Sequence, residues 1–221
     1  MSFVVQRFHP GIRPGLNLGS ANSKFAVHSQ QGQWDSACAL YCVAMALQIT
    51  GLIADSSCVA AHRRRLEAAF WKRAVCYFFT GATFRELEAL IAELDCGMRT
   101  KVAESGSHRK VIAFIERELA RKRLVICSWR GVGESHSHAV LAIGVQGVED
   151  ARRFDGQTLL LLDPAEGPPA KMATCNARLH YAGNEPGKWP RYATYTTIDA
   201  TFSVVLNGAI SIDASEPQKP P

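Results

Sequence analysis

The sequence predicts an α+β fold, in which an N-terminal helical half packs on a C-terminal antiparallel sheet. The first half contains stretches whose apolar residues recur with a helical period. The second half contains short apolar runs bounded by Gly, Asp and Pro, which are typical of strands. Helices that precede the strands, instead of alternating with them, favour α+β. With 221 residues, 47% of them hydrophobic, the chain can bury one substantial core.

Three regions are predicted along the chain. Residues 1–30 are rich in Gly, Pro, Asn and Ser, which indicates an extended N-terminal arm. Residues 31–213 contain neither a repeat nor a linker and are predicted to form one domain. Residues 214–221 are polar and rich in Pro, which predicts a disordered tail.

The first predicted helix covers about residues 36–50 and is apolar nearly all round. A helix without a polar face is expected at the centre of a core. Asp35 and Ser36 are both good N-cap residues, so the helix is expected to begin one or two residues before Cys38.

Three further helices follow from apolar stripes and capping signals. One is predicted over about residues 57–78. Thr83 and Glu86 fit a capping box, which starts the next helix, and Ser107 is an N-cap candidate for the last. Five strands are predicted after these helices, at about residues 124–129, 138–145, 158–162, 192–197 and 202–212.

Composition argues against several classes of function. The net charge of +5 is a mild excess, and nucleic-acid-binding domains are usually more basic, so no nucleic-acid partner is predicted. The longest apolar run, residues 37–47, is shorter than the roughly 20 residues of a membrane span. The N-terminus lacks the apolar core of a signal peptide, which favours the cytoplasm, although secretion as an effector without a cleaved signal stays open.

The seven cysteines are irregularly spaced, without a Cys-x-x-Cys pair. Neither a zinc ribbon nor a redox dithiol is therefore predicted, and the cysteines are expected to be reduced. No metal site and no cofactor are predicted. In particular, no ligand spacing supports a metal site built from Cys127, His136, His138 and Cys175.

Cys38 is the most informative residue of the chain, because it stands at the start of the first predicted helix. Unpaired N–H groups and the helix dipole favour a thiolate there. A thiol nucleophile also needs a base, a group that orients the base and donors for the oxyanion. His138 and Asp163, later in the chain, are candidates for the first two, and Gln31 or Gln33 is a candidate donor.

Three short motifs around these residues occur in a fixed order. The first runs from Gln31 to Cys38 and is followed by the small apolar residues 44–47. The second is the strand that begins at His138, and the third is the Asp163–Pro164 segment. Together they resemble papain-like cysteine peptidases, and most of all the bacteriocin-processing, double-glycine type. The resemblance covers roughly residues 31–167 and implies a papain-like cysteine protease fold, with a central nucleophile helix and a cleft between the helices and the sheet.

The resemblance also implies the role of each residue. Cys38 attacks a carbonyl carbon as a thiolate. His138 forms an ion pair with the thiolate and then protonates the leaving amine, and Asp163 orients the imidazole. The backbone N–H of Cys38 and the side chain of Gln31 or Gln33 bind the oxyanion.

The chain departs from the family pattern at two positions. The residue after the nucleophile is usually Gly, but here it is Ala39, which would lie beside the oxyanion. The family Gln lies six residues before the Cys, where this chain has Gly32 between Gln31 and Gln33. Gln31 is favoured because Gln31–Gly32 resembles the family's Gln-Gly pair. Gln33, Trp34 and Ala39 are the predicted substrate-binding residues.

Two of the site residues have rivals in the sequence. His136 lies two residues before His138, within a loop that begins at Gly131. Asp155 is the alternative to Asp163, in a turn-like Asp-Gly pair.

The prediction is a cysteine peptidase with a Cys-His-Asp triad, which hydrolyses a peptide or isopeptide bond in a protein or peptide substrate. If the resemblance holds, it prefers small residues such as Gly near the scissile bond. Two alternatives remain open. The same triad can perform deamidation or acyl transfer on a protein target, because the acyl-enzyme step is shared. The chain can also be an inactive binding module with a similar scaffold. The sequence predicts no oligomeric state.

Overall fold

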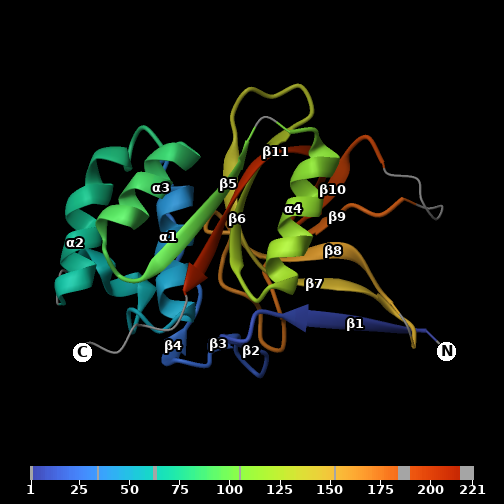
Figure 1. Cartoon of the computed structure of the whole chain (residues 1–221), viewed down its shortest axis with the longest axis horizontal. Helices are drawn as coiled ribbons and strands as arrows, with labels where there is room; N and C mark the ends of the chain where they lie inside the picture. The colour runs from blue at the N-terminus through green and yellow to red at the C-terminus, as the bar shows by residue number, and fades with distance from the viewer. Residues whose placement is uncertain are drawn as a thin grey trace.

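Strands dominate the architecture, and within the described residues eight of them form one antiparallel sheet (Figure 1). The computed structural model describes residues 2–33, 35–61, 64–104, 106–151, 153–183 and 190–214. The strands of this sheet are β1 (Phe3–Phe8), β5 (Met98–Glu104), β6 (Leu124–Gly131), β7 (His138–Glu149), β8 (Phe154–Leu162), β9 (Ala177–His180), β10 (Ala193–Thr196) and β11 (Thr201–Ala214).

Strand β7 closes part of the sheet into a barrel, because it pairs with β6 and also with β8. From β7 the pairings run through β6, β11, β10 and β9 to β8, which returns to β7. Six strands therefore form a closed antiparallel barrel. Strand β1 pairs with the second half of β7, and β5 pairs with the second half of β11.

The predicted fold class is wrong, since the α+β, papain-like arrangement of a helical half on an open sheet is replaced by a mainly β structure with a closed barrel. Two properties of the chain explain the error. Strands β5 and β9 lack the long apolar runs that mark a strand in sequence, and β9 has only 4 residues. Closure depends on the pairing of β6 with β11, which are far apart in the chain, and pairing partners cannot be deduced from the apolar pattern of one strand.

The five predicted strands are all present, as β6, β7, β8, β10 and β11. The strands of residues 3–26 were missed, as were β5 and β9. Strands β2 (Ile12–Arg13), β3 (Gly19–Ser20) and β4 (Ser23–Ala26) form a separate small sheet within the predicted N-terminal arm.

Four α-helices are described: α1 (Cys38–Ile49), α2 (Arg65–Ala74), α3 (Phe84–Glu93) and α4 (His108–Ala120). The helix predicted over 57–78 is wrong, because this region is divided into the 3₁₀ helix Ser56–Ala61, then α2, then the 3₁₀ turn Val75–Tyr77. The backbone of Arg64 is extended, so no helix continues through this residue into α2. The capping box of Thr83 and Glu86 is confirmed at the start of α3.

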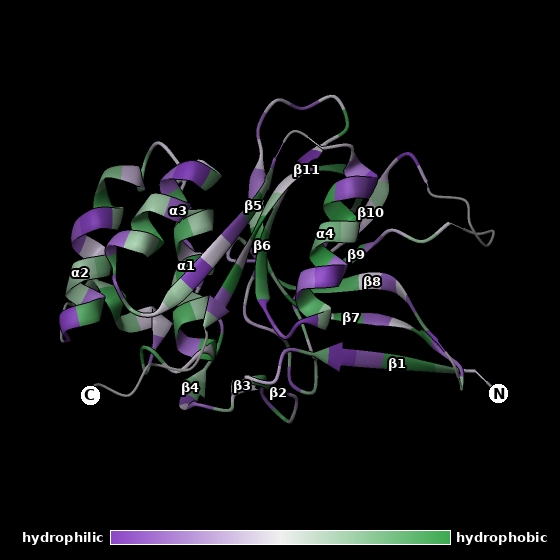
Figure 2. Ribbon diagram, in the orientation of Figure 1, coloured by the Kyte–Doolittle hydropathy of each residue, from purple (hydrophilic) through white to green (hydrophobic). Residues whose placement is uncertain are grey.

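The barrel strands are apolar on both faces, because each face packs against a different layer. Successive residues of β6 alternate between two cores: Leu124 and Ile126 join the core beneath α1, α2 and α3, whereas Val125 and Cys127 join the core that includes α4. In Figure 2, β6 is hydrophobic along most of its length, while α2 and α3 also carry hydrophilic residues. None of the described helices is both long and apolar enough to cross a membrane.

Gln48 connects helix α1 to the small N-terminal sheet. Its side chain is fully buried, and its amide nitrogen donates to the carbonyl of Ala26 at 3.0 Å. Its amide oxygen accepts from the N–H of Ser56 at 2.9 Å. A buried amide with both ends satisfied fixes these segments relative to α1, which carries Cys38 at its start.

Candidate active site

A cleft of about 650 Å³ lies beside the first turn of α1. Cys38 and Ala39 line it from α1, Ser137 lines it from the loop before β7, and Asn207 lines it from β11. Asn207 stands at a bulge in β11, where the register with β6 shifts. Its amide donates to the Ser137 hydroxyl at 2.6 Å, so the bulge fixes the loop at the edge of the cleft.

Cys38 is the first residue of α1, and Ala37 is the N-cap without a side-chain cap. The prediction that Asp35 or Ser36 caps this helix is therefore wrong. Asp35 instead organises the turn before the helix, where its carboxylate accepts from the N–H groups of Gly32 at 2.7 Å and Ala37 at 3.1 Å. The thiol still lies among the first-turn N–H groups, which have no intrahelical partner.

His138 is the first residue of β7 and lies between the thiol and a carboxylate. Its Nε2 is 2.6 Å from Oδ1 of Asp163, and its ring also forms a hydrogen bond with the Cys38 side chain. Because Nε2 faces Asp163, Nδ1 is the nitrogen that remains for the thiol. The ring also contacts Trp129 edge to face, with centroids 5.3 Å apart, which restricts its orientation.

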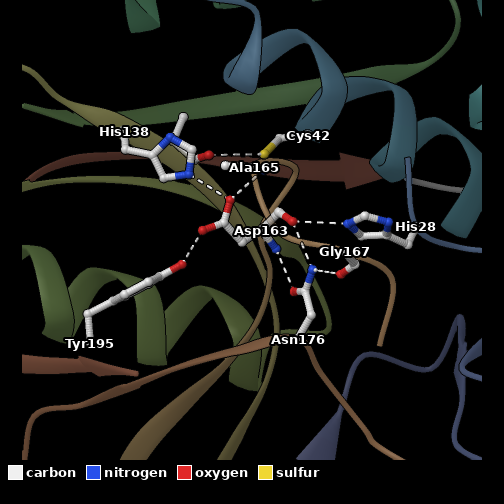
Figure 3. A network of polar contacts seen from close by, with 9 residues as sticks. His28, Cys42, His138, Asp163, Ala165, Gly167, Asn176 and Tyr195 are labelled. Atoms are coloured by element: carbon white, nitrogen blue, oxygen red, sulfur yellow. Dashed lines mark hydrogen bonds and ion pairs between the residues drawn. The ribbon is translucent and has the colours of Figure 1, made fainter. Parts of the chain in front are cut away.

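Asp163 follows the last residue of β8 and is almost completely buried (Figure 3). Its Oδ1 also accepts from the N–H of Ala165 at 2.8 Å, and its Oδ2 accepts from the Tyr195 hydroxyl. The Asn176 side chain binds both the N–H and the C=O of Asp163, each at 2.8 Å, and His28 approaches the same C=O at 3.0 Å. Both the backbone and the carboxylate of Asp163 are therefore held in place.

The pKa values indicate a thiolate–imidazolium pair. Burial would lower the pKa of His138, but its hydrogen bonds to Asp163 and Cys38, together with their negative charges, raise that pKa to about 10. Burial would raise the pKa of Cys38, but the hydrogen bond and charge of His138, with backbone hydrogen bonds from Ala139 and Ala39, lower it instead. Burial likewise opposes ionisation of Asp163, but the hydrogen bond and charge of His138, with hydrogen bonds from Tyr195 and Ala165, together lower the pKa of the carboxyl.

Cys38 differs in this respect from other buried cysteines. Burial raises the pKa of Cys42 well above its ordinary value, and it raises the pKa of Cys127 to about 12. Cys42 is one turn further along α1, where its thiol contacts the Ala139 carbonyl at 3.6 Å. The hydrogen-bond and charge partners of Cys38, and not its place on the helix alone, therefore give it a lower pKa than these other buried cysteines.

The predicted oxyanion and substrate residues lie in different environments. The backbone N–H of Gln31 donates to the Pro164 carbonyl at 2.8 Å, which places Gln31 beside Asp163. Its Oε1 is buried without a hydrogen-bond partner among the described residues. Gln33 is exposed, Ala39 is buried at the cleft, and Trp34 lies outside the described residues.

The rival residues are not brought into the hydrogen-bonded series. His136 is exposed and lines the cleft, while Asp155 is exposed in β8 and pairs with Arg153 at 3.7 Å. Within the described part of the chain, His, Cys, Asp and Glu side chains form no cluster of three that could hold a metal.

Sequence reasoning missed Tyr195, Asn176 and His28 as neighbours of Asp163. Tyr195 belongs to a short strand whose alternation marks it as an inward-facing residue but does not reveal its partner. Asn176 and His28 act from segments without regular structure, where no periodic pattern exists to interpret.

No protein-family model matches the chain, and no curated protein matches its sequence. The resemblance to papain-like peptidases stays a prediction from three motifs. The function therefore has to be inferred from the geometry of the site.

Proposed function

We propose that this chain is a cysteine hydrolase, and specifically a peptidase, with Cys38 as nucleophile, His138 as acid and base, and Asp163 as orienting acid. One observation carries the proposal: these three side chains form a hydrogen-bonded series, and the thiol at its end lines an open cleft. The fold contributes nothing to this proposal, which depends on the site alone.

The reaction follows from the protonation states. The Cys38 thiolate attacks the substrate carbonyl carbon, and the carbonyl π electrons move to oxygen. As the tetrahedral intermediate collapses, His138 gives its Nδ1 proton to the leaving amine, and a thioester remains. Neutral His138 then takes a proton from water, which attacks the thioester and releases the acid and the thiolate. Asp163 accepts the Nε2–H throughout and keeps Nδ1 directed at the thiol.

The cleft suits an extended peptide with small residues. Its walls near Cys38 are lined by small side chains, including Ala39, Gly81, Ala82 and Ser137. All seven cysteines are free, and a reduced Cys38 is required for activity. We therefore propose a protein or peptide substrate with Gly or another small residue near the scissile bond, and a cytoplasmic site of action.

The contact between Cys38 and His138, and the open cleft beside them, favour an enzyme over an inactive binding module. Deamidation and acyl transfer use the same acyl-enzyme intermediate and differ only in the substrate or the acceptor. Mass spectrometry of candidate substrates separates these reactions, since peptide hydrolysis releases a fragment and deamidation does not.

Reaction with iodoacetamide tests the proposal without a known substrate. Cys58 and Cys76 are exposed, whereas Cys38 is half-buried, so ordinary thiol reactivity would favour the two exposed residues. We expect Cys38 to react first below neutral pH, because its thiolate forms at lower pH than an ordinary thiol. Peptide mapping identifies the modified residue, with Cys38→Ala as control. Faster modification of Cys58 and Cys76 at every pH would overturn the proposal.

Gln31 and Gln33 provide a test of the oxyanion site. Gln31 lies next to the Asp163 segment, whereas Gln33 is exposed, so we propose the side-chain N–H of Gln31 as the donor. Gln31→Ala is expected to lower kcat by about 10²-fold or more, as is typical when one oxyanion donor is lost. Gln33→Ala is the matched control and should retain kcat. The opposite result would assign the oxyanion donor to Gln33.

A further inference from the structure

Tyr195 contacts Asp163 from β10, a barrel strand that pairs with β9 and β11. It lies on β10, is 1% exposed, and donates its hydroxyl to Oδ2 of Asp163. Its ring packs on Trp129 with centroids 4.5 Å apart and on Phe202 with centroids 5.3 Å apart. Figure 3 shows the phenol pointing at the carboxylate from the side opposite His28.

The two carboxylate oxygens of Asp163 therefore accept hydrogen bonds from different donors. Oδ1 accepts from His138 Nε2 and from the N–H of Ala165. Oδ2 accepts from Tyr195. A carboxylate held through both oxygens cannot rotate without breaking at least one of these bonds, so the phenol also fixes the oxygen that faces the imidazole.

The aromatic surroundings make the phenol hard to replace by water. Trp129 is 8% exposed and contacts both Tyr195 and His138, so it separates this region from solvent. Without the hydroxyl, Oδ2 would be a buried acceptor without its donor, and a buried carboxylate in that state is costly.

We propose that Tyr195 is a positioning residue of the site, whose hydroxyl keeps Asp163 ionised and keeps Oδ1 directed at His138. This inference rests on the proposed function, because it assigns Tyr195 a role in the same Cys-His-Asp series. Tyr195 is not among the residues that line the cleft, and its hydroxyl acts on the site through Asp163.

Several other titratable groups influence this carboxylate or the phenol from neighbouring segments. The histidines, thiols and carboxylate among them are His138, His28, Cys42, Cys127 and Glu166. Removal of the Tyr195 hydroxyl leaves all of these groups in place. Because that hydroxyl favours the charged form of Asp163, its loss is expected to raise the pKa of the carboxyl.

Nuclear magnetic resonance of ¹⁵N-histidine-labelled protein tests the inference with Tyr195→Phe. The Nε2–H resonance of His138 depends on the ionisation of Asp163, which accepts this proton. In the variant, we expect the low-pH change of this resonance to occur at a higher pH than in the unmodified protein, because a hydrogen bond to the charged form of Asp163 is lost. Incorporation of 3-fluorotyrosine at position 195, a more acidic phenol, should move it in the opposite direction.

Tyr181→Phe is the matched control. Tyr181 is also 1% exposed and donates its hydroxyl to a carboxylate, Oε1 of Glu116, at 2.5 Å. Both variants remove a buried phenol–carboxylate bond, but only Tyr195→Phe should change the His138 titration.

The outcomes separate the two proposals. An unchanged His138 titration in Tyr195→Phe, with Cys38 still the most reactive thiol, would overturn the role of Tyr195 and leave the hydrolase intact. An unreactive Cys38 in the unmodified protein would overturn the hydrolase itself. If Tyr195→Phe does not fold, the 3-fluorotyrosine protein, which keeps the hydroxyl, decides the question by the direction of its shift.

Discussion

Replacement of His138 by Gln is expected to slow the alkylation of Cys38 at about pH 6.5 by roughly 100-fold, because the thiol loses the partner that favours its ionised form. Burial is the largest influence on this thiol and acts to raise its pKa. The hydrogen bond and positive charge of His138 oppose it. Without them, only the backbone bonds from Ala139 and Ala39 favour the thiolate, so the pKa should rise above that of an ordinary cysteine.

The measurement contains its own reference, because Cys58 and Cys76 are exposed and should react at unchanged rates in the same sample. His136→Gln is the matched control, since His136 lines the same cleft but is exposed and two residues away. An equal loss of Cys38 reactivity in both variants would indicate a general effect on the loop. An unchanged rate in His138→Gln would contradict the ion pair.

The candidate site was easier to predict from sequence than the fold that carries it. Cys38, His138 and Asp163 each stand at the boundary of a regular element, and boundaries leave strong local signals: a helix start, a strand start and an Asp-Pro pair. The same three residues are brought together in the structure.

The barrel left no comparable signal. Strand β8 is buried on both faces from Thr158 to Leu162, so its apolar run predicts a strand but neither its partners nor its register. It pairs with β7 on one side and with β9 on the other, and β9 lies within a polar stretch of sequence. Closure, and with it the contact of Tyr195 with Asp163, also depends on the pairing of β6 with β11, two strands that are far apart in the chain.

Replacement of Asp163 by Asn is expected to lower the pKa of His138 from about 10 towards its ordinary value of 6.5, because burial would then be opposed by Cys38 alone. The pH at which the rate of hydrolysis declines on the alkaline side of its profile should fall together with the pKa of His138. At about pH 8 the imidazolium would be lost, and we expect hydrolysis to fall by about 10²–10⁴-fold, within the range seen when a triad acid is replaced by its amide.

The structure also predicts why the Asp163→Asn variant loses activity. The N–H of Ala165 is a fixed donor to Oδ1, so an amide NH₂ placed there would meet another donor. At the position of Oδ2 it would meet the Tyr195 hydroxyl, which can rotate and accept. The introduced amide should therefore keep its oxygen towards His138 and preserve the Nε2–H tautomer. The loss would then come from the missing charge, and activity should persist at pH values below the lowered pKa of His138.

Two measurements distinguish this account from a change of tautomer. The pH profile should keep an active region on its acid side, and the ¹⁵N resonances of His138 in Asp163→Asn should still show a proton on Nε2. An unprotonated Nε2, with hydrolysis lost at every pH, would mean that the amide had turned its nitrogen towards the imidazole. In that arrangement Nδ1 would carry the proton and could not accept one from Cys38. The result would also mean that the hydrogen bonds from Ala165 and Tyr195 are too weak to orient the amide.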